Sequence, residues 1–220
     1  MNLCIRGVGL AVKGELRGKA RDHKGPDGSP VTDQPGSLGN RERILSAALR
    51  LFTTHGFHAA PTAQISKEAR VSTGTLFHYF PDKNTLVDQL YLSIQKEVSE
   101  AIRKNDEPAL PIKQRLEQCL RGYIAWGMAN PDKFRFMEQF YNSPSIGDDV
   151  KNQAYQEFRW LFDLSDTAIR EGILRDLPPG FHAVMVMRIL NGILALIASG
   201  DTGMSSDEII KNGLDLIWKR

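Results

Sequence analysis

The segment spanning residues 62–80, TAQISKEARVSTGTLFHYF, carries the side chains of this chain that are best suited to chemistry. Its second half presents polar groups with no carboxylate among them, namely Ser72, Thr73, Thr75, His78 and Tyr79. Hydroxyl, imidazole and phenol groups hydrogen-bond to phosphate oxygens and base edges, where a carboxylate would be repelled. Lys83 adds a positive charge just beyond the segment. The residue types therefore favour a nucleic-acid-binding surface.

Two short helices are needed to position these side chains. The apolar spacing predicts one helix over residues 62–69 and a second over residues 73–80, packed through Ile65, Ala69, Val71 and Leu76. The small side chain of Ser66 would let the two helices approach each other closely. Taken alone, such a pair could also be a compact helical corner that does not bind DNA.

Helices are also predicted on either side of this pair. Residues 40–55 repeat apolar side chains at helical spacing, and Gly56 is placed to end that helix. Pro81 would stop the second short helix, and Asp82 is placed to cap a long helix over residues 82–103.

Residues 69–86, ARVSTGTLFHYFPDKNTL, and the helix before them resemble the DNA-binding head of the TetR family of bacterial transcriptional repressors. The usual run of that family is close to A-G-V-S-x-G-T-L-Y-x-Y-F-x-x-K-x-x-L. The resemblance covers residues 40–90 in detail and implies a helix-turn-helix that binds a double-stranded DNA operator. The residues expected against DNA are Thr62, Ser72, Thr73, Thr75, His78, Tyr79 and Lys83.

Two residues depart from the family pattern. Arg70 stands where the turn usually has glycine, so either a non-glycine residue holds a left-handed conformation or the turn differs. Phe77 stands where tyrosine is common, and it lacks the hydroxyl that often reaches a phosphate.

The remainder of the chain is expected to be all-α. Helices are predicted over residues 110–129, 131–142, 147–172, 179–199 and 205–219. Residues 1–39 are expected to be a disordered tail or an over-extended translation start, with a basic DNA-contacting arm as the alternative. The predicted organisation is this tail, a helix-turn-helix domain over 40–86, and an effector-binding and dimerisation domain over 87–220.

Aromatic residues concentrate within residues 123–162. An ordinary core would use such residues too, but apolar space between helices with a few polar groups is also where small ligands bind. In the resembled family the corresponding helices enclose an effector pocket, so the expected lining is Tyr123, Trp126, Phe134, Met137, Phe140, Tyr141, Phe158 and Phe162. Gln139, Asn142 and Asn191 are possible polar contacts for a largely apolar or aromatic effector.

The last two predicted helices carry apolar surface on several sides. Residues 183–198, AVMVMRILNGILALIA, are apolar nearly all round. The resembled family packs this pair of helices against its copy as a four-helix bundle, which predicts a homodimer. The expected interface residues are Ile189, Gly192, Leu196, Ile210, Leu214 and Ile217, with burial inside one subunit as the alternative.

Composition narrows the remaining possibilities. The formal net charge is +2, with basic character over residues 1–86 and mildly acidic character over 87–220. Two distant cysteines, Cys4 and Cys119, are typical of a reducing cytoplasm. The apolar run over 183–198 is interrupted by Arg188 and is shorter than the roughly 20 residues that a bilayer requires, so no membrane partner is expected. No catalytic, metal-ligand or cofactor motif is recognisable, so no enzyme activity, metal or cofactor is expected.

These observations predict a cytoplasmic, ligand-responsive transcriptional regulator. It would bind a palindromic operator as a homodimer, act as a repressor and be released by a small apolar or aromatic effector. One alternative is a helical ligand-binding or scaffold protein that has lost DNA binding, which Arg70 alone supports. A second alternative is an enzyme whose catalytic residues are not recognisable.

Overall fold

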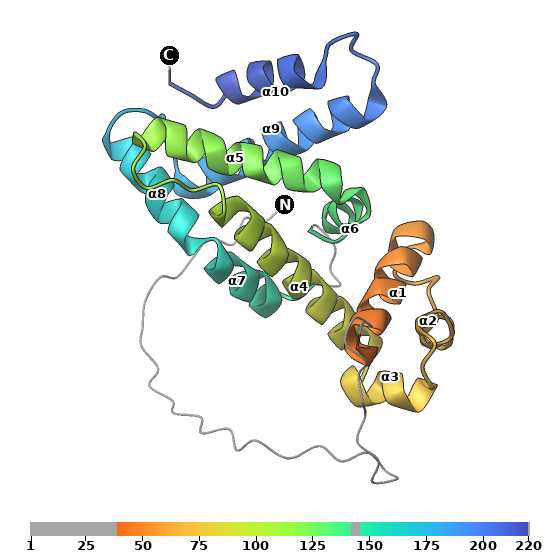
Figure 1. Cartoon of the computed structure of the whole chain (residues 1–220). Coiled ribbons are helices and arrows are strands. Elements are labelled where there is room, and N and C mark those ends of the chain that lie inside the picture. Colours follow the sequence, from red (N-terminus) through yellow and green to blue (C-terminus); the bar gives the residue numbers. More distant parts are fainter. Residues whose placement is uncertain (1–38, 142–145, 220) are drawn as a thin grey trace, which may run out of the picture. The chain divides into compact units, whose positions relative to one another are not determined.

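The computed structural model describes residues 39–141 and 146–219 of the chain (Figure 1). Within them every regular element is a helix, which confirms the predicted all-α fold. Residues 1–38 and Asn142 lie outside the described residues, as does the side chain of Tyr141. The helices of the described part are α1 Asn40–His55, α2 Thr62–Ala69, α3 Thr73–Tyr79, α4 Lys83–Arg103, α5 Ile112–Ala129, α6 Pro131–Tyr141, α7 Asp148–Glu157, α8 Arg159–Arg170, α9 Pro179–Ser199 and α10 Ser206–Asp215.

The ends of the first four helices follow local sequence signals. Gly56 adopts a φ of +77° at the end of α1, a left-handed conformation that favours glycine. The Ser72 Oγ accepts a hydrogen bond from the Thr75 backbone N–H at 2.9 Å and caps α3. The Asp82 Oδ1 accepts from the Thr85 backbone N–H at 2.7 Å and caps α4. The predicted bounds of these helices are therefore correct to within one residue.

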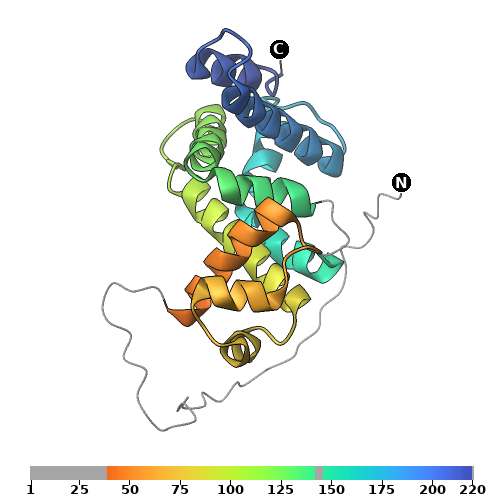
Figure 2. The same ribbon diagram turned by 90° about the vertical axis from the view of Figure 1, so that its right-hand side faces the viewer.

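Helices α1, α2 and α3 form a small unit at one end of the described chain, and α9 and α10 lie at the other end (Figures 1 and 2). Helix α1 packs against α2, α3, α4 and α6. Its Phe52 is fully buried, as are Ile65 of α2 and Leu76 of α3. These three side chains hold the helices of the small unit together.

Helix α4 connects the small unit to the rest of the described chain. It packs against α1, α5 and α7, and α5 packs in turn against α6, α8 and α9. The predicted apolar face of α4 is buried along its length, from Leu86 through Ile94 to Ile102. A single helix therefore contributes to both the DNA-binding unit expected from the sequence and the helical body.

The helix predicted over residues 147–172 is interrupted at Phe158, which has φ −104° and ψ 3°. In an unbroken helix the Glu157 carbonyl would accept from the residue 161 N–H. Instead it accepts from the Ser99 Oγ of α4 at 2.7 Å, and the Leu161 N–H donates to the Phe158 carbonyl at 2.9 Å. The prediction of one helix was wrong because its interruption depends on a side chain 58 residues away.

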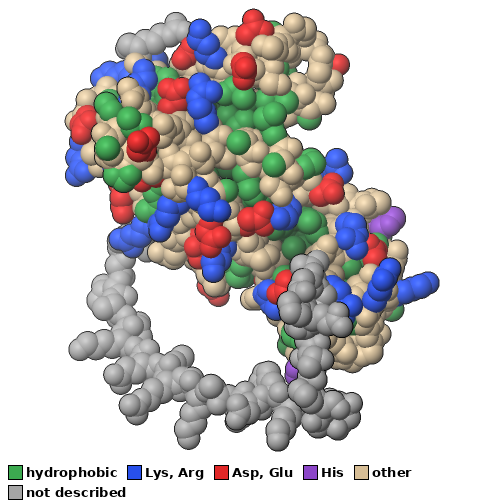
Figure 3. Space-filling model, viewed as in Figure 1, with side chains coloured by type: hydrophobic (Ala, Val, Ile, Leu, Met, Phe, Trp, Pro, Cys, Tyr) green, Lys and Arg blue, Asp and Glu red, His purple; other side chains and the backbone are tan. Residues whose placement is uncertain are grey.

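Helix α9 leaves an apolar face uncovered. Leu190, Ile193 and Leu194 are buried, whereas the opposite side has apolar residues that are 44–53% exposed: Phe181, Val184, Met185 and Leu196. Figure 3 shows apolar side chains reaching the surface beside α9. This is the largest run of exposed apolar side chains on one helix of the described residues.

By length and composition alone, residues Gly180–Ser199 could cross a membrane. The apolar run over residues 183–198 lies within a longer helix, because α9 begins four residues before Ala183. Core and interface helices of soluble proteins reach the same length and hydropathy, so this single helix does not indicate a membrane protein.

Candidate DNA-binding surface

Helix α3 is held by its inner side and exposes the rest of its surface. Leu76 is fully buried, and Phe80, just after the helix, is 1% exposed. Phe77 and Tyr79 are 42% and 41% exposed, and His78 is exposed between them. The His78 and Tyr79 rings contact each other edge-on, with centroids 5.5 Å apart. The exposed surface of α3 therefore combines an imidazole, a phenol and a phenyl group.

The hydroxyl groups expected on this surface are engaged with one another and with α2. The Ser72 and Thr75 hydroxyl oxygens are 2.8 Å apart. The Thr73 Oγ1 lies 3.3 Å from the Oγ of Ser66, which is buried and also donates to the Ala63 carbonyl. This contact confirms that Ser66 lies where α2 and α3 approach each other. It also engages the Thr73 hydroxyl with α2.

The structure adds two residues that the sequence pattern did not place on this surface. Gly74 lies on the outward side of α3, where a Cβ atom would meet nothing closer than the Ser72 Oγ at 3.7 Å. Phe77 exposes an apolar ring beside it, and such rings contact thymine methyl groups in the major groove. Both could have been identified from the sequence, because helical spacing places Gly74 and Phe77 away from the buried side of α3 that Leu76 defines.

Arg70 occupies the turn between α2 and α3 with φ 55° and ψ 45°. The Arg70 N–H donates to the Lys67 carbonyl and the Val71 N–H to the Ser66 carbonyl, at 3.1 and 3.0 Å. This pair of bonds is the Schellman motif, in which glycine is the usual residue at the position of Arg70. Of the two alternatives that the sequence left open, the left-handed conformation is the one observed, and it costs an L-residue roughly 1–2 kcal/mol. The turn keeps its shape, so the sequence support for loss of DNA binding disappears.

Lys83 does not extend from the surface of α3. Its Nζ donates to the Phe57 carbonyl, just after α1, and lies 4.5 Å from the centroid of the Phe57 ring. Burial lowers the pKa of the Lys83 ammonium. Its expected role as a charge beside α3 is therefore corrected: Lys83 fastens the start of α4 to the end of α1.

The charged residues around α2 leave this region basic. Within residues 62–80 the charged side chains are Lys67, Glu68 and Arg70. Glu68 is paired with Arg50 of α1, whose Nε lies 2.6 Å from the Glu68 Oε1. Figure 3 shows several Lys and Arg side chains over this end of the chain. Thr62, the first residue of α2, is half-buried at the edge of the same region.

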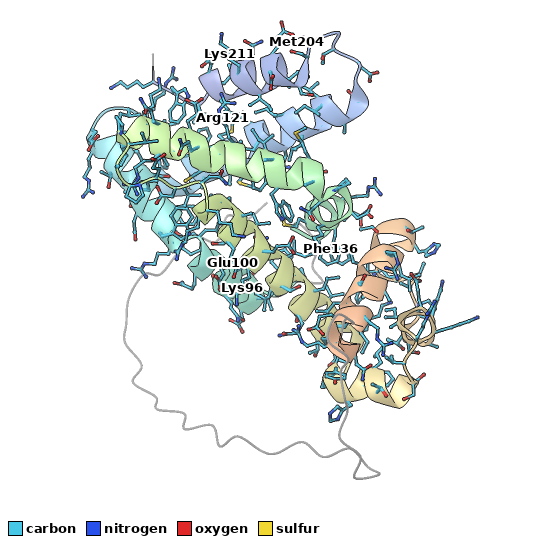
Figure 4. The ribbon with its side chains drawn as sticks, in the orientation of Figure 1. Lys96, Glu100, Arg121, Phe136, Met204 and Lys211 are labelled. Carbon is cyan, nitrogen blue, oxygen red and sulfur yellow. The ribbon has the colours of Figure 1, made fainter. Side chains whose placement is uncertain are left out.

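The eight residues expected to line an effector pocket do not come together as one group. Phe140 stacks on Phe136 with ring centroids 4.4 Å apart, and both rings face Phe52 of α1 at 6.0 and 6.4 Å. Phe136, labelled in Figure 4, lies between α6 and α1. Phe140 is thus part of the contact between α1 and α6.

A second group lies deeper, between α4, α5 and α9. The Tyr123 hydroxyl donates to the Asn191 Oδ1 at 3.0 Å, and the Trp126 Nε1 donates to the Glu97 Oε1 at 3.1 Å. Burial raises the pKa of the Tyr123 hydroxyl, with the negative charge of Glu138 as a smaller cause. Asn191 was expected as a polar contact, whereas Glu97 was missed because an isolated carboxylate on an amphipathic helix gives no sequence signal.

The remaining aromatic residues lie elsewhere. Phe162 stacks on Tyr155 at 4.5 Å, and Tyr155 is 51% exposed. Phe134 and Phe158 are half-buried, and Met137 is buried. A shallow hollow between the end of α4 and α5 is lined by none of them; its residues are Lys104, Asn105, Asp106, Glu107, Gln118 and Arg121.

The expected dimer residues divide into two sets. Leu196 is 46% exposed, Ile189 and Gly192 are half-buried, and a Cβ atom at Gly192 would meet open space. Leu214 and Ile217, in contrast, are 1% and 8% exposed inside the subunit. The last two are corrected from interface to core residues, because the apolar stripe of α10 packs on α9 of the same chain. Ile210 is half-buried.

An N-terminal helix-turn-helix with an exposed second helix, followed by a helical body, defines a DNA-binding transcription regulator. Residues 44–90 match the family described as bacterial regulatory proteins, tetR family. A crystal structure assigned to tetR-family transcription regulators, from Shewanella sp. PV-4, is 28% identical with a TM-score of 0.72, and covers 83% of this chain and 100% of its own.

One further structure shares the fold, and one further sequence relative is a transcriptional regulator. A TetR-family transcription regulator from Marinobacter aquaeolei VT8 is 20% identical with a TM-score of 0.75, over 82% of this chain and 96% of its own. The HTH-type transcriptional regulator UidR of Escherichia coli K12 is 26% identical over 166 residues, covering 73% of this chain and 83% of UidR. Over residues 44–90 the chain therefore matches the TetR family of bacterial transcriptional regulators, and over most of its length it shares the fold of TetR-family structures.

Proposed function

We propose that this protein is a homodimeric repressor that binds a palindromic operator through α3 and releases it when a small, largely apolar effector binds the helical body. The match of residues 44–90 to the TetR family and the similarity to TetR-family regulators support DNA binding and transcription regulation. Beyond these two properties, we propose the homodimer, the symmetric operator, repression and the type of effector.

The main support for the proposed dimer is the uncovered apolar face of α9. Exposed apolar surface of this extent marks an interaction site in a soluble protein. Phe181, Met185 and Leu196 recur at helical spacing on this face, and Gly192 between them leaves room for close approach of a second helix. Two copies joined there would carry two α3 helices. A dimer of helix-turn-helix units requires half-sites about one helical turn, roughly 34 Å, apart.

The outward surface of α3 supports entry into the major groove. Gly74 keeps the middle of that surface flat, while His78 and Phe77 flank it with one polar and one apolar group. A groove about 12 Å wide admits a helix whose outward side is not bulky. Base contacts are therefore assigned to Thr75, Phe77 and His78, and Tyr79 to the edge of the contact.

The effector is proposed to enter beside Tyr123 and Trp126. Both side chains are largely buried, and the polar atom of each donates a hydrogen bond to another helix. Tyr123 donates to Asn191 of α9, and Trp126 donates to Glu97 of α4. Apolar walls with one or two such polar groups suit a flat or apolar ligand with a matching polar atom. A ligand that replaces either hydrogen bond would separate the helices that it joins.

Helix α4 provides a path from that region to α3. Glu97 binds Trp126 of α5 and the ammonium of Lys133 on α6, the latter at 2.6 Å. At its other end, α4 begins at Lys83, which holds the end of α1. A ligand that favours a different position of α4 would thereby change the separation of two α3 helices in a dimer, and only such a difference in affinity can shift the equilibrium.

The test combines a ligand screen with operator release. Apolar compounds that raise the melting temperature would be added to the complex of the protein with its own upstream intergenic DNA, followed by fluorescence anisotropy. We expect at least one stabilising compound to lower DNA affinity, and the effect to be lost in Trp126→Ala with its fold retained. Stabilising compounds that never change DNA affinity would contradict the proposed regulation.

A further inference from the structure

We propose that Arg70 is a DNA-backbone contact: its guanidinium binds a phosphate beside the site of α3 and adds sequence-independent affinity. The inference rests on DNA binding by the α2–α3 unit. It concerns a residue of the turn, outside the recognition helix itself.

The backbone at Arg70 is unfavourable for any residue with a Cβ atom. Among the described residues, Arg70 alone has a positive φ without being glycine; the others are Gly56, Gly172, Gly200 and Gly203. Glycine would adopt the same turn without steric conflict, and the Schellman hydrogen bonds use only main-chain atoms. The local fold therefore gains nothing from arginine at this position.

The Arg70 side chain also contributes no contact within the described protein. It is exposed and has no hydrogen-bond or ion-pair partner among the described residues. Several arginines of the described chain pair with carboxylates, such as Arg115 with Asp106 at 2.9 Å and Arg121 with Glu117 at 2.9 Å, whereas Arg70 does not. An unfavourable backbone combined with an unused guanidinium indicates a partner outside the subunit.

The surroundings of Arg70 select an anionic partner. Lys67 is exposed one turn earlier on α2, and Glu68 is neutralised by Arg50. No Asp or Glu occurs over residues 69–81. The planar guanidinium binds two phosphate oxygens at once, which a lysine ammonium cannot do with the same geometry.

The position of Arg70 favours the DNA backbone over the bases. It lies two residues before Ser72, the cap of α3, and is not on the outward side of that helix. A long side chain from the end of a helix that lies in a groove reaches the strand bordering that groove. The contact should therefore strengthen binding to any duplex by the same factor.

The experiment compares Arg70→Gly with wild type on two duplexes, one from the chain's own upstream intergenic DNA and one of random sequence, by anisotropy over a range of salt. We expect Arg70→Gly to bind both duplexes about tenfold more weakly. The slope of log affinity against log salt should fall by about one unit, as for one lost phosphate contact. The melting temperature of the free protein should stay the same or rise, because glycine suits the turn.

Two matched variants sharpen the result. Arg175→Gly removes one exposed positive charge far from α2 and α3 and should leave affinity and slope unchanged. Arg70→Lys keeps the charge and should retain the slope while losing part of the affinity. If Arg70→Gly binds DNA with the same affinity and the same salt slope as wild type, this inference is overturned, but DNA binding by α2–α3 is not. A wild type that binds neither duplex would overturn DNA binding by α2–α3 and the inference with it.

Discussion

At Gly74 of α3, the residue that is best for helix stability differs from the residue that is best for contact with DNA. A glycine inside a helix is less favourable than alanine by about 1 kcal/mol, and a methyl group at Gly74 has free space around it. Gly74→Ala should therefore stabilise the protein by about 0.5–1 kcal/mol in chemical denaturation. It should at the same time weaken operator binding, because the added methyl group faces the groove. Stronger or unchanged DNA binding would show that this side of α3 does not approach the duplex.

Lys83 is predicted to matter for stability more than for the salt dependence of binding. Lys83→Met removes a charge-assisted hydrogen bond to the Phe57 carbonyl and a contact with the Phe57 ring. We expect a loss of about 1–3 kcal/mol in free energy of unfolding. The salt slope of non-specific binding should change by much less than one unit. If the salt slope instead changed by a full unit while the free energy of unfolding stayed the same, Lys83 would be a DNA contact after all.

Individual residues were predictable where their role is local in sequence. Ser72 and Asp82 as caps and Leu76 as a core residue follow from neighbours within four positions. Lys83 was not predictable, because its partner is 26 residues earlier and lies close only after α1 and α4 pack.

At the scale of elements, the contact between α1 and α6 depends on stacked rings. Phe140 is 3% exposed and faces Phe136 and Phe52, so Phe140→Ala would leave a cavity between two helices. We expect a loss of about 3–5 kcal/mol in free energy of unfolding, measured by urea denaturation. Tyr155→Ala is the control, because Tyr155 is half-exposed in its stack with Phe162 and should cost far less.

A Phe140→Ala protein as stable as wild type would show that α1 and α6 are not joined through this stack. The elements themselves were largely predictable from apolar spacing and from Pro and Gly breaks. The aromatic residues of 123–162 were expected to line one effector pocket, and their division among three groups was not predicted. Which neighbour each ring meets depends on helix packing, and periodicity within one helix does not contain that information.

At the scale of the whole molecule, the exposed side of α9 predicts a dimer whose interface can be removed without unfolding the subunit. Met185→Glu and Leu196→Glu change residues that are 44% and 46% exposed. Each should convert a particle of about twice 24.6 kDa in light scattering to a monomer with native helix content. Leu214→Glu should instead unfold the chain, because Leu214 is 1% exposed within the subunit.

A monomeric wild type, or a dimer that survives both α9 substitutions, would contradict this interface. The sequence predicted surplus apolar surface on the last two helices. It could not divide that surface between α10, which is turned inward, and the side of α9 that stays exposed, since both carry the same apolar pattern.

The most direct test of the central claim, that α3 binds DNA, is the affinity of wild type, Tyr79→Ala and Tyr155→Ala for a labelled duplex from the upstream intergenic DNA. Tyr79 and Tyr155 are 41% and 51% exposed, so neither substitution should unfold the protein. We predict tight wild-type binding, a loss of about tenfold or more in Tyr79→Ala, and no change in Tyr155→Ala. The claim that α3 binds DNA would be contradicted if Tyr79→Ala and Tyr155→Ala both bound the duplex as tightly as wild type. It would also be contradicted if the wild type did not bind the duplex.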